Sequence, residues 1–137
     1  PNLIERIETG LKSYGQDMTI ENNPFEASMD NYINLDKKAE FMSRDALMKV
    51  AETGPAKRLV NIVIDGEELA LMRTDWRVLD EAGEQVGMVT SRTYSPHMRA
   101  NIGMAMVKPS FASPGTVVMV DADGDICRAT VRDAKWQ

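Results

Sequence analysis

The stretch from Gly87 to Val107, GMVTSRTYSPHMRANIGMAMV, holds the residue types that a serine hydrolase uses. It contains His97, the single histidine of the chain, close to several hydroxyl side chains. A serine nucleophile with a histidine base also needs an acid, an oxyanion hole and a strained turn at the nucleophile. No Gly-x-Ser-x-Gly pattern occurs in the stretch. The favoured interpretation is therefore a strand, a turn at Ser95–Pro96 and a returning strand.

The same stretch makes definite predictions about side-chain orientation. Regular alternation along a strand would place Thr90 on one face of the sheet and Ser91 on the other. His97 would then be an exposed polar residue of the turn. Gly103, in the returning strand, would allow close approach of a neighbouring backbone.

Metal chemistry is not expected from the remaining candidates. Cys127 lies in the alternating stretch DICRATV, which favours a small apolar strand residue over a nucleophile. One histidine and one cysteine are too few for a His/Cys zinc site. The DADGD run at residues 121–125 lacks the later glutamate of a calcium loop, so it favours a hairpin turn.

Composition excludes several classes of partner. The chain has 137 residues, enough for one domain or for one small domain and part of another. Its net charge of -5, its 6% aromatic content and the lack of a basic cluster argue against nucleic-acid binding. Apolar runs such as TVVMV are too short to span a membrane. A single cysteine and no signal-peptide pattern predict a cytoplasmic protein.

Two helices and a linking segment are predicted in the first part of the chain. Apolar residues recur at helical spacing from Leu3 to Leu11, with a capping box at Asn2 and Glu5, which predicts a helix over 3–13. Residues 16–40 are polar and turn-prone and are interpreted as a linking segment. A second helix is predicted in FMSRDALMKVAETG, with Ser43 as its cap and a stop at Gly54.

Period-two patterns follow from residue 58 onward and predict strands. Six stretches alternate or form short apolar runs between turn signals: RLVNIVI, DWRVLD, EQVGMVTSRTY, NIGMAMV, TVVMVD and ICRATVRD. The predicted fold class is mainly β with α. It comprises an antiparallel β-barrel or jelly-roll-like C-terminal domain preceded by two helices and the linking segment.

An ordered set of motifs resembles the glycine cleavage T-protein (aminomethyltransferase) superfamily over nearly the whole chain. RIETGLKSYGQDM, NPFEASM and FMSRDALMKV resemble its Leu-x-x-Glu-x-Gly helix, Tyr-Gly, Pro-Leu-Glu-Ala and Asp-Phe-Ile-Gly-Arg-Glu-Ala-Leu elements. GMVTSRTYSP resembles its signature Gly-x-Val-Thr-Ser-Gly-Thr-x-Ser-Pro, and PGTVVMV with ATV resembles its closing hairpin.

The resemblance implies a tetrahydrofolate-dependent methyl or aminomethyl transferase built as a three-lobed ring around the folate. Residues 1–40 would be the end of a folate-binding lobe and the linking segment, and 41–137 the C-terminal β-barrel domain with its preceding helix. The chain opens without methionine, and the family's key aspartate lies in N-terminal lobes absent from this sequence. We therefore expect no catalytic residue here and a chain that is not an enzyme by itself. Its expected partners are a small methyl or aminomethyl donor and those lobes.

Departures from the family pattern indicate which branch of the family this sequence resembles. Asn31 stands where T-proteins have tryptophan, and Arg92 replaces the glycine of Thr-Ser-Gly-Thr. The GLKSYGQDMTIENNPFE stretch looks more like the demethylase branch, which includes dimethylsulfoniopropionate demethylase. The alternative is a non-catalytic folate-binding or protein-interaction β-barrel module. Relatives that serve iron–sulfur assembly carry a cysteine motif that is not found here.

The resemblance also implies cofactor-binding residues. Tyr14 and Arg6 match the family's tyrosine and arginine that line the folate cavity. An aromatic face suits the pterin or benzoyl ring, and a guanidinium suits the carboxylates of the tail. The alternative is that Arg6 is a solvated helix residue and that Tyr14 packs beside Gly15. For four further residues, the sequence leaves open whether the side chain faces the folate: Arg73, Trp76, Arg77 and Arg92.

Overall fold

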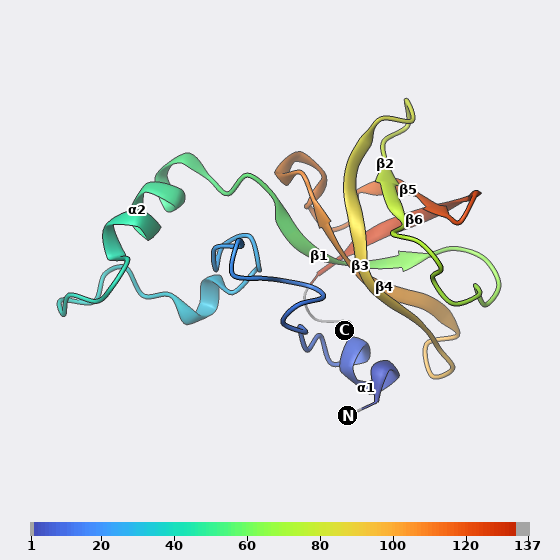
Figure 1. The fold of residues 1–137 in the computed structure, drawn as a ribbon, viewed down its shortest axis with the longest axis horizontal. Coiled ribbons are helices and arrows are strands. Elements are labelled where there is room, and N and C mark those ends of the chain that lie inside the picture. The colour runs from blue at the N-terminus through green and yellow to red at the C-terminus, as the bar shows by residue number, and fades with distance from the viewer. Residues whose placement is uncertain (1, 134–137) are drawn as a thin grey trace.

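The computed structural model describes residues 2–133, in which six antiparallel strands close into a barrel (Figure 1). The strand order around the barrel is β1-β4-β3-β2-β5-β6. Each strand therefore has a hydrogen-bonded neighbour on both sides. The strands are β1 (Arg58–Ile64), β2 (Arg77–Leu79), β3 (Gln85–Ser95), β4 (Ala100–Val107), β5 (Val117–Ala122) and β6 (Asp125–Arg132).

All six predicted strands are present, and the predicted mainly β class is confirmed. Alternating apolar residues of every strand point inward, because a strand presents successive side chains to opposite faces. Trp76, immediately before β2, is 2% exposed and joins this core. The core is otherwise built of aliphatic side chains, among them Ile62, Ile64, Val78, Val107, Val120 and Val131.

Two glycine-containing sites confirm the predicted turn and close approach. The β5–β6 turn has positive φ at Asp123 (53°) and Gly124 (103°), as a tight hairpin turn requires. In β4, a Cβ added at Gly103 would lie 2.5 Å from the carbonyl oxygen of Ser91 in β3. That position therefore admits glycine and excludes larger residues.

The pairing of β3 with β4 is interrupted by a β-bulge. Val89 pairs with Ala105 and Ser91 pairs with Met104, so Thr90 is an extra residue on β3. A bulge bends the strand and re-aims the side chains on it. The prediction that Thr90 and Ser91 face opposite sides was wrong, because both hydroxyls reach the same carboxylate, that of Asp17.

The first helix is shorter than predicted. α1 (Leu3–Glu8) has the predicted capping box at Asn2 and Glu5, but it ends at Glu8 instead of residue 13. Gly10 has φ of 72°, outside the helical region, which explains the early stop. Ile7 is fully buried where α1 packs against β3 and β4.

The linking segment contacts the barrel at residues 26–30 and then leads away from it. Backbone N–H of Leu59 donates to the carbonyl of Glu26 at 2.7 Å, and the Ser28 hydroxyl donates to the carbonyl of Leu59 at 2.7 Å. The guanidinium of Arg58 meets the Asp30 carboxylate at 2.6 Å. These contacts end at the first residue of a 3₁₀ turn, η1 (Asp30–Tyr32), and hold residues 26–30 beside the start of β1.

The second helix, α2 (Arg44–Thr53), lies at the far end of the molecule from the barrel (Figure 1). Ser43 precedes it as predicted, but its φ is 67° and its side chain makes no capping hydrogen bond, so the predicted cap was wrong. No residue of α2 is buried. A second 3₁₀ turn, η2 (Pro109–Phe111), joins β4 to β5. No helix in residues 2–133 has the length and apolarity needed to cross a membrane.

Candidate functional site

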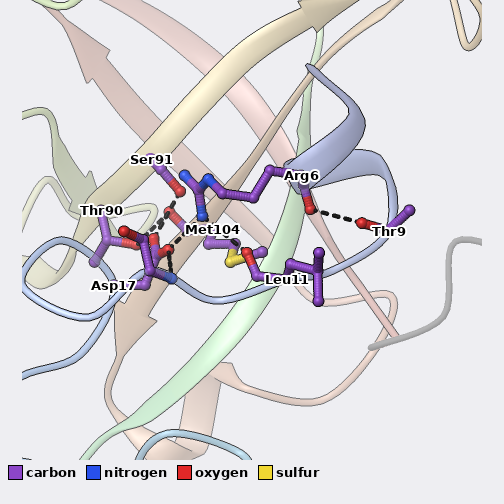
Figure 2. A network of polar contacts seen from close by, with 8 residues as sticks. Arg6, Thr9, Leu11, Asp17, Thr90, Ser91 and Met104 are labelled. Atoms are coloured by element: carbon purple, nitrogen blue, oxygen red, sulfur yellow. Dashed lines mark hydrogen bonds and ion pairs between the residues drawn. The ribbon is translucent and has the colours of Figure 1, made fainter. Parts of the chain in front are cut away.

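A buried carboxylate lies where the N-terminal segment meets the barrel. The side chain of Asp17 is 0% exposed and accepts hydrogen bonds from the N-terminal segment and from β3 (Figure 2). Its Oδ1 accepts from the hydroxyls of Thr90 and Ser91, each at 2.6 Å. Its Oδ2 accepts from Arg6 Nη1 at 2.7 Å and from the backbone N–H of Ser13 at 2.8 Å. A buried charge is tolerated when it is paired and hydrogen-bonded in this way.

Arg6, predicted to bind the cofactor, is the cationic partner in this network. It projects from α1, and its side chain is 14% exposed, so it is not the solvated helix residue of the alternative interpretation. Its Nη1 also donates to the carbonyl of Leu11 at 2.9 Å. Its Nη2 is buried with no hydrogen-bond partner among the described residues. Arg6 therefore holds the segment that follows α1 in place, and its Nη2 remains an unused hydrogen-bond donor.

Tyr14, the second predicted cofactor residue, is presented on a tight turn. The N–H of Gly15 donates to the carbonyl of Met18 at 2.7 Å, and the N–H of Asp17 donates to the carbonyl of Ser13 at 2.8 Å. Gly15 has φ of 89°, a conformation that favours glycine. Tyr14 is 69% exposed, so it does not pack away beside Gly15. The structure thus connects Tyr14 and Arg6 through one turn, residues 13–18.

A cleft of about 980 Å³ opens beside that turn. One wall is formed by Gly15 to Asn22, and the other by β3, β4 and residues 72–75. Its lining combines methionine side chains with Thr90, Arg73 and Lys57. The methionines are Met18, Met72, Met88 and Met106.

The structure shows where the four residues lie whose orientation towards the folate the sequence leaves open. Trp76 is in the core, and the guanidinium of Arg92 stacks over its ring at 4.7 Å from the centroid. Arg92 also donates to the carbonyl of Leu69 at 2.9 Å and is 8% exposed, and this burial lowers the pKa of its guanidinium. Arg77 is exposed and pairs with Asp121 at 2.6 Å, while Arg73 lines the cleft.

The hydroxyl residues around His97 form no nucleophile–base pair. His97 is exposed in the β3–β4 turn, as predicted. Ser91 donates to Asp17, while Ser95 donates to Glu8 and accepts from the N–H of Met98. Burial raises the pKa of the Cys127 thiol, which disfavours a thiolate nucleophile. Among the described residues, no group of three or more histidine, cysteine, aspartate or glutamate side chains is placed to hold a metal.

Asp17 is the site residue that sequence reasoning missed. It lies in a polar stretch that reads as an exposed linking segment, and its partners Thr90 and Ser91 are 73 and 74 residues away. The signal in the sequence is the adjacent Thr-Ser pair in the middle of a strand. Its role in binding the Asp17 carboxylate becomes clear only when the bulge in β3 is known.

Comparison with known proteins places this geometry in a family. Residues 57–136 match the glycine cleavage T-protein C-terminal barrel domain. An aminomethyltransferase of Synechococcus sp. (strain CC9902) is 42% identical over 126 residues, which cover 92% of this chain and 34% of that protein. The dimethylsulfoniopropionate demethylase DmdA of Ruegeria pomeroyi is 37% identical over 137 residues, which are 100% of this chain and 36% of that protein.

The fold agrees with a solved structure over nearly the whole chain. The aminomethyltransferase T of the glycine cleavage system from Bartonella henselae superposes with a TM-score of 0.85 at 23% identity, covering 96% of this chain and 37% of that one. The chain therefore spans about a third of the length of these relatives.

The predicted resemblance is thus confirmed by the match to the family's barrel domain, by the relatives and by the similar fold. The chain belongs to the glycine cleavage T-protein family and carries that family's C-terminal barrel domain.

Proposed function

We propose that this chain is the C-terminal part of a tetrahydrofolate-dependent one-carbon transferase that moves a methyl or aminomethyl group. The relatives it matches include aminomethyltransferases and a dimethylsulfoniopropionate demethylase. Residues 1–40 would complete a folate-binding lobe, and the barrel would close one side of the site. The N-terminal lobes would supply the catalytic aspartate, in a cytoplasmic enzyme.

The residues present suit a folate in different ways. Tyr14 offers an aromatic face that is 69% exposed, which a pterin or benzoyl ring can cover. The Nη2 atom of Arg6 is an unpaired donor but is buried, so a folate carboxylate would reach it only after a local rearrangement. We therefore assign direct contact to Tyr14 and assign support of its turn to Arg6. That exposed tyrosine on a fixed turn is the observation that carries the proposal.

The chemistry requires little covalent work from this chain. When bound, tetrahydrofolate accepts the one-carbon unit at N5. This part of the protein contributes orientation, by presenting Tyr14 on a turn that is anchored to the barrel. It would also exclude water on the side of the site that the closed, packed barrel covers.

The proposal is tested by assaying the longer protein that contains this sequence. Purified protein is incubated with tetrahydrofolate and a sulfonium, an amine or a methoxyaryl donor whose methyl or aminomethyl carbon is ¹³C-labelled. We expect the label to appear on tetrahydrofolate with one donor class, as detected by NMR. Absence of transfer from every donor, with folate still bound, would favour the non-catalytic folate-binding module.

A further inference from the structure

The turn that carries Tyr14 owes its internal shape to short-range hydrogen bonds. The Ser13–Asp17 and Gly15–Met18 backbone hydrogen bonds close it on itself, and Tyr14 forms a bridge with Met18. These bonds fix the turn internally but do not fix it relative to the rest of the molecule. Its placement requires a contact to the barrel.

Asp17 supplies that contact through its side chain. One carboxylate oxygen faces the barrel and accepts from Thr90 and Ser91, and the other faces the N-terminal segment and accepts from Arg6 and Ser13 (Figure 2). Four donors surround one fully buried carboxylate, so its orientation is tightly determined.

The barrel is shaped locally to receive this carboxylate. In a regular strand, the hydroxyls of Thr90 and Ser91 would diverge to opposite faces. The extra residue at the bulge instead brings both hydroxyls to the same oxygen. Gly103 of β4 pairs with Arg92, next to the bulge, and a Cβ there would meet the Ser91 carbonyl oxygen at 2.5 Å, so β4 also accommodates this conformation.

From these contacts we propose that Asp17 is a positioning residue for tetrahydrofolate: it locks the Tyr14 turn against the β3 bulge so that the aromatic ring is held ready for the cofactor. This inference rests on the proposed function. Asp17 itself is buried, with 1% of its surface exposed, and its carboxylate oxygens are taken up by four protein donors. Its contribution reaches the cofactor through Tyr14.

Hydrogen exchange in the unliganded protein tests the lock directly. Thr90→Val and Ser91→Ala each remove one hydroxyl and retain the Asp17–Arg6 pair, so both variants should fold. We expect the amides of residues 13–18 to exchange about tenfold faster in each variant, because local opening becomes easier. Asp45→Asn, which alters an exposed carboxylate of α2, should leave these amides unchanged. Unchanged exchange in both hydroxyl variants would overturn the inference.

A double-mutant cycle on tetrahydrofolate binding tests the link to Tyr14 in the longer protein. Asp17→Asn, Thr90→Val and Tyr14→Ala are measured by calorimetry, alone and in combination. We expect Asp17→Asn to raise the Kd about tenfold, and to raise it no further in the Tyr14→Ala background. Thr90→Val gives the same comparison if Asp17→Asn fails to fold.

The outcomes of the cycle separate the two proposals. Additive effects, or silent Asp17 and Thr90 variants beside a weakened Tyr14→Ala, would overturn the positioning role and leave the folate site standing. Unchanged binding in Tyr14→Ala would overturn the folate contact together with the positioning role. Non-additivity supports both.

Discussion

Arg92, which is expected to replace a glycine of the family motif, packs its side chain into the barrel. The guanidinium lies 4.7 Å from the centroid of the Trp76 ring and donates to the carbonyl of Leu69 at 2.9 Å. The first contact covers one face of the Trp76 ring, and the second ties the loop between β1 and β2 to β3. Arg92 is therefore interpreted as a stabilising residue, pointing neither into water nor freely into a ligand site.

Arg92→Ala should lower the stability of the fold. The variant loses the stacking on Trp76 and leaves the Leu69 carbonyl without its donor, which together cost about 1–3 kcal/mol. Chemical denaturation followed by circular dichroism measures the free energy of unfolding. Arg73→Ala, at an exposed arginine of the cleft, should change it by less than about 0.5 kcal/mol. Equal effects of the two substitutions would contradict the stacking role.

At the scale of elements, two aspartates of the β5–β6 hairpin hold β2 and the loop before it. The Thr74 hydroxyl donates to Asp123 at 2.6 Å, and Arg77 donates to Asp121 across the β2–β5 pair at 2.6 Å. The Thr74 hydrogen bond is the main cause that lowers the pKa of Asp123, and the Arg77 hydrogen bond is the main cause for the lowered pKa of Asp121. Both carboxylates are therefore stabilised in their ionised form by folding.

This arrangement predicts a loss of stability in acid. Because folding lowers both pKa values, the stabilisation is fully present above the unfolded pKa of about 3.9 and is lost as the pH falls below it through the folded pKa. Asp123→Asn removes one of these titrating groups, so the fall in melting temperature between pH 5 and pH 3 should be smaller than in the parent protein. Asp75→Asn, at an exposed position beside the same loop, is the control. An unaltered pH profile in Asp123→Asn would count against the role of Asp123.

The sequence predicts some structural elements better than others. The strands were predictable because alternation is a local property, and the short turn at Asp123–Gly124 carries its own residue signature. The end of α1 was misplaced because apolar spacing continued to Leu11, while Gly10 took a positive φ. The bulge at Thr90 was not predictable, because it appears only in the register between β3 and β4. The burial of Asp17 was not predictable either, because it depends on contact with a residue 73 positions away.

At the scale of the whole molecule, the N-terminal segment is part of the barrel's structure and part of the proposed ligand site. α1 packs on β3 and β4, and the Asp17 carboxylate joins the following turn to the β3 bulge. α2 lies apart from this assembly and buries none of its residues (Figure 1). The turn with Tyr14 is thus the feature through which the barrel would act on a folate held by the preceding lobes.

Tetrahydrofolate binding by the longer protein and its tyrosine variants shows whether Tyr14 contacts the cofactor. Tyr14→Ala removes the proposed contact, and Tyr32→Ala removes another exposed tyrosine, 84% exposed against 69% for Tyr14. We expect calorimetry to show a Kd raised about tenfold or more in Tyr14→Ala, since stacking on an aromatic side chain contributes about 1–3 kcal/mol per base-sized ring. Tyr32→Ala should bind as the parent does. Equal affinity of all three proteins, or no binding by the parent, would contradict the account.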